Sequence, residues 1–67
     1  MKQIYVKKQL NQYLLALLGS VGLVDQWWYG GNKAFDGRTP IDVYHSGEEG
    51  RMRVANYIIS QCNGDYH

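Results

Sequence analysis

The stretch WWYGGNKAFDGRTPIDVYHSGEEG, residues 27–50, decides how this chain folds, because it holds both tryptophans, the only proline and most of the glycines. The pair Gly30-Gly31 ends any helix that contains the tryptophans, and Asp36-Gly37 is a dipeptide typical of tight turns. Thr39-Pro40 then predicts a new helix, with threonine as the N-cap and proline in the first helical position. The stretch therefore predicts two helices joined by an ordered loop over residues 30–38.

Apolar residues at helical spacing predict further helices on both sides of this loop. Leucines recur at this spacing before the loop and predict a first helix over residues 3–18. Its start is open, because residues 4–6 (Ile, Tyr and Val) favour extended backbone, so this segment is either a first helical turn or an extended arm. Residues 21–29 predict a short second helix that Ser20 caps.

Beyond the loop, the third helix has room only for residues 40–45. Ser46 and Glu49 then form an S-x-x-E capping box, which predicts that Ser46 opens a last helix running through Cys62 and stopping at Asn63-Gly64. The prediction is an all-α fold: a small bundle of about four helices that forms one helical domain over residues 1–67.

Composition and charge exclude several classes of function. Seven basic and six acidic residues give a net charge of +1, which does not favour binding to nucleic acid. One cysteine and two histidines lack the spacing of a metal site, so we expect no metal and no cofactor. No apolar run has the length of a membrane span or the pattern of a signal peptide, so we expect no membrane partner and a cytoplasmic location.

The residue types that carry catalysis all have simpler structural explanations. Cys62 falls on the apolar face of the last helix, where a thiol usually fills the core. His45 falls at a helix end, and Glu48 and Glu49 fall in a first helical turn, where acidic residues favour the helix dipole. No acid, base and nucleophile come together in this pattern, so we expect that the protein is not an enzyme.

The adjacent tryptophans are the most informative aromatic residues. On a helix, Trp27 and Trp28 point about 100° apart, so a small core buries one of them readily and both only with difficulty. We expect one to belong to the core, while the other is either half-covered or part of an interface anchor. Tryptophan, tyrosine and arginine most often carry binding energy at interfaces.

The residue order in this region resembles the toxin-binding domain of the Xre/MbcA/ParS antitoxin family, over about residues 20–64. The shared residues are Trp27, Asn32, Ala34, Phe35, Gly37, Arg38, Thr39, Pro40, Ile41, Glu49 and Gly50. Members often have proline where this chain has Gly31 and Lys33, leucine is common at Tyr44, and members usually carry a DNA-binding helix-turn-helix region before the domain. The resemblance implies an all-helical toxin-binding module and does not imply autorepressor activity.

Several of the shared residues have a structural role that the residue types themselves suggest. Gly37 is expected to adopt a positive φ, and Phe35 is expected to tuck the loop onto the core. Asn32 and Arg38 are expected to bind loop carbonyls, while Thr39 and Pro40 fix the start of the next helix.

By resemblance, the partner would be a toxin enzyme of the RES or a related class, inhibited by occlusion of its active site. The predicted contact residues have no expected core role: they are one of Trp27 and Trp28, together with Tyr29, Arg51, Asp65, Tyr66 and His67. Two alternatives stay open: an inhibitor, encoded by a mobile element, of a host enzyme or a defence complex such as a CRISPR effector, and a DNA-binding regulator. The leucine-rich first helix and the aromatic surplus also predict a homodimer.

Overall fold

The structure, a computed structural model, describes residues 6–62 of the chain. It contains the helices α1 (Lys7–Leu18), α2 (Val21–Tyr29), α3 (Pro40–His45) and α4 (Glu48–Cys62), and a single 3-10 turn, η1 (Lys33–Phe35). These residues include no β-strand, so the predicted all-α bundle of four helices is confirmed.

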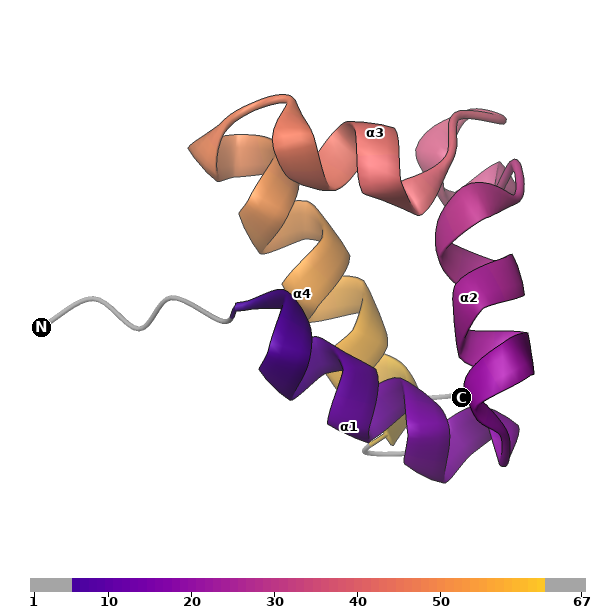
Figure 1. The fold of residues 1–67 in the computed structure, drawn as a ribbon. Helices are drawn as coiled ribbons and strands as arrows, with labels where there is room; N and C mark the ends of the chain where they lie inside the picture. The colour runs from indigo at the N-terminus through magenta and orange to yellow at the C-terminus, as the bar shows by residue number, and fades with distance from the viewer. Residues whose placement is uncertain (1–5, 63–67) are drawn as a thin grey trace, which may run out of the picture.

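The helices form a closed frame around one core, with α1 opposite α3 and with α2 and α4 connecting them (Figure 1). Consecutive helices pack against each other, and α1 also packs against α4, so the first and last helices close the frame. Every helix contributes to the core. Its buried apolar residues are Leu10, Leu14, Val24, Trp28, Phe35, Val43, Tyr44, Val54, Ala55 and Ile58.

Helix α1 begins at Lys7, later than the predicted residue 3. Val6 is extended, with φ −84° and ψ 161°, and its backbone N–H donates to Oε1 of Gln9 at 3.2 Å. This bond satisfies a backbone donor that the helix itself cannot pair. For Val6 the extended alternative is therefore the correct one, and residues 3–5 lie outside the described residues.

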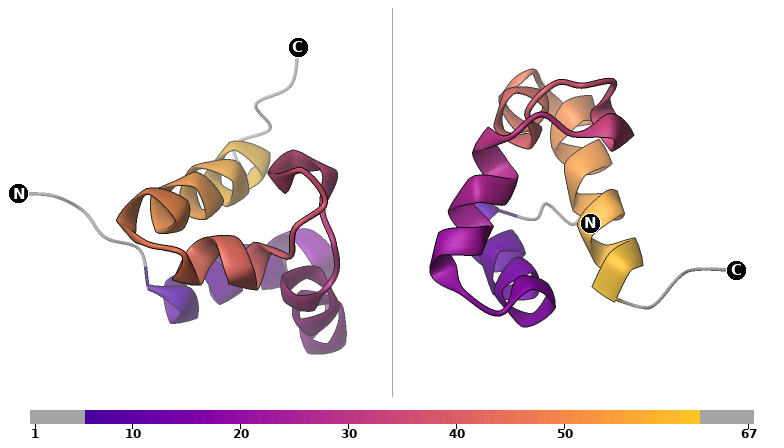
Figure 2. Two further views of the ribbon diagram at one scale, coloured as in Figure 1. Left: turned by 90° about the horizontal axis from the view of Figure 1, so that it is seen from above. Right: turned by 90° about the vertical axis from the view of Figure 1, so that its right-hand side faces the viewer.

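The loop between α2 and α3 (Figure 2) is held in place by hydrogen bonds between its own backbone groups. The N–H of Asn32 donates to the carbonyl of Arg38 at 3.0 Å, and the N–H of Gly37 donates to the carbonyl of Asn32 at 2.9 Å. Asp36 and Gly37 both have positive φ, 60° and 84°, which confirms the predicted turn. Phe35, as expected, packs the loop onto the core.

Side-chain bonding in the loop differs from the prediction. Oδ1 of Asn32 accepts the N–H of Ala34 at 2.9 Å, so this side chain caps η1, and it donates to no carbonyl among residues 6–62. The arginine that reaches a loop carbonyl is Arg53 of α4, whose Nη2 donates to Ala34 at 3.4 Å, whereas Arg38 is exposed. The sequence position of Arg38 suggested this role, but the fold gives it to an arginine that is distant in sequence.

The start of α3 is built as predicted. The hydroxyl of Thr39 accepts the N–H of Asp42 at 3.2 Å, and Pro40 occupies the first helical turn with its side chain buried. Asp42 supplies the acidic first turn that the helix dipole favours. Helix α3 therefore leaves the loop in a direction fixed by local residues.

The predicted capping box between Ser46 and Glu49 is wrong. Ser46 ends α3, and its hydroxyl donates to the carbonyl of Val43 at 2.7 Å, so it does not cap the next helix. Gly47, at φ 148°, intervenes before α4 begins. The reason is the close approach of α3 and α4: a Cβ at Gly50 would clash with the carbonyl of Val43 and the hydroxyl of Ser46.

Candidate protein-binding surfaces

Trp28 is the tryptophan that belongs to the core, where it is 1% exposed. Its Nε1 donates to Oδ1 of Asn11 on α1 at 2.6 Å, which satisfies the polar atom of a buried indole. Its ring meets that of Tyr44 edge to face, with 5.6 Å between centroids. Of the two predicted alternatives, Trp28 is therefore the structural one, and its side chain does not reach the surface.

Trp27 is half-buried and faces α4. Its ring stacks on Tyr57 with 6.3 Å between centroids and 18° between planes, and it meets Phe35 edge to face at 6.5 Å. Because Tyr57 is also half-buried, the stacked pair is partly open to solvent. Trp27 is thus the tryptophan that a partner can contact.

The stacked pair belongs to an apolar cleft of about 280 Å³ between α1, α2 and α4. We call it the Trp27 cleft; its lining includes Leu14, Leu17, Leu18, Trp27, Tyr57 and Ile58. Leu17 is 41% exposed, although it lies on a helix whose other core-side leucines are buried or half-buried. Leucine and flat aromatic rings, together with Gln61, line this opening, and apolar and aromatic linings of this kind are common in binding sites.

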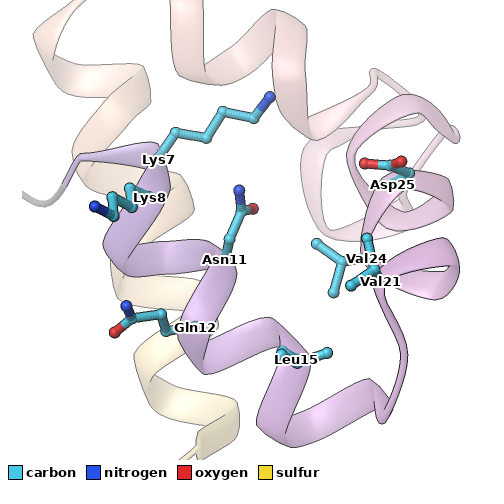
Figure 3. A pocket seen from close by; sticks show the side chains of 8 residues that line it. All are labelled: Lys7, Lys8, Asn11, Gln12, Leu15, Val21, Val24 and Asp25. Atoms are coloured by element: carbon cyan, nitrogen blue, oxygen red, sulfur yellow. The ribbon is translucent and has the colours of Figure 1, made fainter.

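A second apolar depression of about 470 Å³ lies between α1 and α2. We call it the α1–α2 groove; its lining includes Lys7, Lys8, Asn11, Leu15, Val21 and Asp25. Figure 3 shows Leu15 pointing from α1 toward α2, close to the end where the helices join, and Asp25 on the α2 side. Leu15 is 43% exposed and Val21 67%, so the floor of the groove is apolar and open.

Tyr29 lies at the end of α2 and is 63% exposed, so its side chain is accessible as predicted. The Nζ of Lys7 lies 5.8 Å from the centroid of its ring and 5.3 Å from the centroid of Trp28. This cation–π contact ties the first turn of α1 to the last turn of α2.

Arg51 lies apart from Trp27, in a shallow pocket of about 290 Å³ at the junction of α3 and α4. Its guanidinium carbon is 5.1 Å from the centroid of Tyr44, and its buried Nε has no hydrogen-bond partner among residues 6–62. The ring contact gives Arg51 a packing role between the two helices. Asp65, Tyr66 and His67, the other predicted contact residues, lie outside the described residues.

Of the residues predicted to bind a partner, Trp28 is buried in the core, and Trp27, Tyr29 and Arg51 lie in three separate places. The sequence did not predict the two apolar depressions. Leu17 is one of the leucines whose helical spacing predicts a buried stripe, and the sequence pattern predicts no function for Leu15 or Val21. Helical spacing identifies a stripe, but only the packing of three helices decides which of its members stay exposed. Periodicity alone therefore does not predict which leucines stay half-exposed.

No helix within the described part of the chain is long and apolar enough to cross a membrane. Over residues 6–62, no three side chains of the histidine, cysteine, aspartate and glutamate types group as metal ligands would.

Comparisons with known proteins found no match for this chain among protein-family models, curated proteins or solved structures.

Proposed function

We propose that this chain is a non-enzymatic protein-binding module that inhibits a partner protein by covering the partner's functional surface. The observation that supports it most is the Trp27 cleft, where a half-buried tryptophan lies stacked on a tyrosine beside a leucine that is 41% exposed. An apolar side chain of a partner, inserted against this stack, would bury both rings in one contact. Buried aromatic anchors of this kind carry much of the free energy of protein association.

The partner class that we propose is a toxin enzyme. It rests on the residues that resemble the antitoxin family, which run from Trp27 through the Gly-Arg-Thr-Pro sequence at residues 37–40 to Gly50. The alternative partner is a host enzyme or a nucleic-acid-guided defence complex, for which the same cleft would serve. Both partner classes would be met in the cytoplasm.

Two leucines of α1 allow a matched test of the cleft. Leu17 lines the Trp27 cleft and Leu15 lines the α1–α2 groove, and their exposed fractions are 41% and 43%. Leu17→Glu places a charge at the mouth of the cleft, whereas Leu15→Glu places the same charge on the same helix but outside it. Circular dichroism of both variants verifies that the helices form.

The experiment captures partners on the immobilised chain from lysate of the producing cell, identifies them by mass spectrometry and then measures their activity with added chain. We expect the wild-type chain and Leu15→Glu to retain and inhibit the partner, and Leu17→Glu to bind at least tenfold more weakly, because an uncompensated buried charge costs several kcal/mol. A toxin enzyme as the captured partner would support the first class, and a defence complex the alternative.

Equal capture by Leu17→Glu and the wild-type chain would show that the cleft is not the contact surface. Binding without any loss of the partner's activity would contradict inhibition. A gel-shift series at low salt addresses the DNA-binding alternative, since phosphate contacts are strongest there. Retarded DNA at low salt would replace the present proposal with a regulatory one.

A further inference from the structure

We infer that the α1–α2 groove is a two-fold interface between two copies of this chain. The groove has an apolar floor, and the exposed side chains of Leu15 and Val21 lie on it. Exposed apolar side chains of this size that lie together in one groove are typical of association surfaces. A partner that binds in this groove must therefore place apolar side chains against Leu15 and Val21.

The charges on the two rims of the groove are opposite. Lys7 and Lys8 lie on the α1 side, and Asp25 lies on the α2 side (Figure 3). Lys7 is engaged with the rings of Trp28 and Tyr29, whereas Lys8 and Asp25 are exposed and have no ion-pair or hydrogen-bond partner among the described residues. The groove thus offers one cationic rim and one anionic rim, each open to a partner.

A second copy of the chain satisfies this pattern. In a two-fold interface, the same patch meets itself, so any contact between two positions occurs twice. If the axis runs along the groove, the α1 rim of one copy faces the α2 rim of the other. Lys8 of each copy then lies opposite Asp25 of its partner, while Leu15 and Val21 of both copies meet at the end of the groove where α1 and α2 join.

The first test reverses these charges. Lys8→Glu and Asp25→Lys each place two like-charge pairs in the interface, and we expect each to weaken the dimer about tenfold at low salt, because two rim attractions become repulsions. The double variant Lys8→Glu/Asp25→Lys restores both attractions and should dimerise like the wild-type chain. Sedimentation equilibrium across a series of concentrations measures the dissociation constants.

Mixing provides an internal control for this arrangement. When Lys8→Glu chains and Asp25→Lys chains are combined, every rim pair is attractive, so a heterodimer should form at concentrations where each variant alone is monomeric. Added salt should reduce the differences in dissociation constant among the wild-type chain, the variants and the mixture, because the rim charges are exposed and are therefore screened.

The matched leucines provide a second test on the apolar floor. Leu15→Glu should abolish the dimer, and Leu17→Glu should leave it unchanged, which is the reverse of their expected effects on partner capture. The groove and the Trp27 cleft share no lining residue, so this proposal and the proposed function fail separately.

A wild-type chain that stays monomeric at millimolar concentration would overturn the dimer. A dimer that responds neither to the charge reversals nor to Leu15→Glu would place the contact on another face and would overturn the assignment of the groove. Recovery of dimer in the double variant and in the mixture would support it, since a merely destabilised monomer would not regain association on mixing.

Discussion

Trp28 and Asn11 connect α2 to α1 through a hydrogen bond of 2.6 Å between the indole and the amide oxygen. We expect Trp28→Phe to lower the free energy of unfolding by about 2–3 kcal/mol, because it removes this bond and leaves a void beside Tyr44 in a closely packed core. Chemical denaturation followed by circular dichroism measures the loss.

Trp27→Phe is the matched control. This substitution keeps an aromatic ring on Tyr57 at a half-buried position, so it should cost about 1 kcal/mol or less. Equal losses in the two variants would contradict the division of the pair into one core residue and one surface residue.

The tryptophan pair also shows what the sequence predicted at the scale of single residues. Helical geometry alone predicted that Trp27 and Trp28 point apart and that one of them is buried. It did not decide which, because the choice depends on Asn11 of α1 and Tyr57 of α4, which lie far from the pair in sequence. Local spacing fixes the angle between two side chains, and long-range packing decides which of them is covered.

At the scale of helices, two glycines inside helical segments should respond oppositely to alanine. A methyl group on Gly50 would clash with α3, so we expect Gly50→Ala to lower the free energy of unfolding by about 2–4 kcal/mol. A methyl group on Gly22 meets no atom within 4 Å, so Gly22→Ala should raise it by up to about 1 kcal/mol through helix propensity.

Denaturation of both alanine variants under one set of conditions measures the two changes. A stabilised Gly50→Ala variant would show that α3 and α4 do not approach as closely as the structure has them. Loss of stability in Gly22→Ala would contradict the open surroundings of that residue.

Helix boundaries were predictable where one residue determines them. Ser20 and Thr39 accept N–H groups of their own first turns, and α2 and α3 begin where the sequence placed them. The predicted start of α4 was wrong, because the hydroxyl of Ser46 donates to a carbonyl of α3 at the point where Gly50 allows close packing. A capping pattern therefore predicts a helix start only when no neighbouring helix competes for the capping group.

For the whole molecule, the closed frame of helices predicts cooperative unfolding. The longest helix, α4, has 15 residues, and isolated helices of this length are marginally stable in water. Each helix gains its stability from burial against its neighbours, so loss of one should remove the support of the others. Circular dichroism and tryptophan fluorescence should therefore report the same denaturation midpoint and the same slope.

Two separate transitions in these signals would contradict this expectation. A fluorescence change that precedes the loss of helix would mean that the α2 region opens while α3 and α4 stay paired.

The number of helices and their connecting loop were thus predictable from the sequence, but the surfaces were not. The Trp27 cleft is formed by three helices and the α1–α2 groove by two, and neither follows from the periodicity of one segment. Leu15 and Leu17 lie two positions apart and are exposed to nearly equal extents, yet they line different depressions. Which depression each leucine lines is decided by how the helices pack against one another.

The division of the two indoles between core and cleft gives the molecule an optical consequence. Trp28 is shielded from solvent, so unfolding of the chain changes the surroundings of its indole most strongly. Trp27 lies at the opening of the Trp27 cleft. A bound partner that displaces water from its ring should therefore shift its emission toward shorter wavelengths. The intrinsic fluorescence of the two tryptophans therefore reports both the folding of the chain and the occupancy of the Trp27 cleft, and no attached dye is needed.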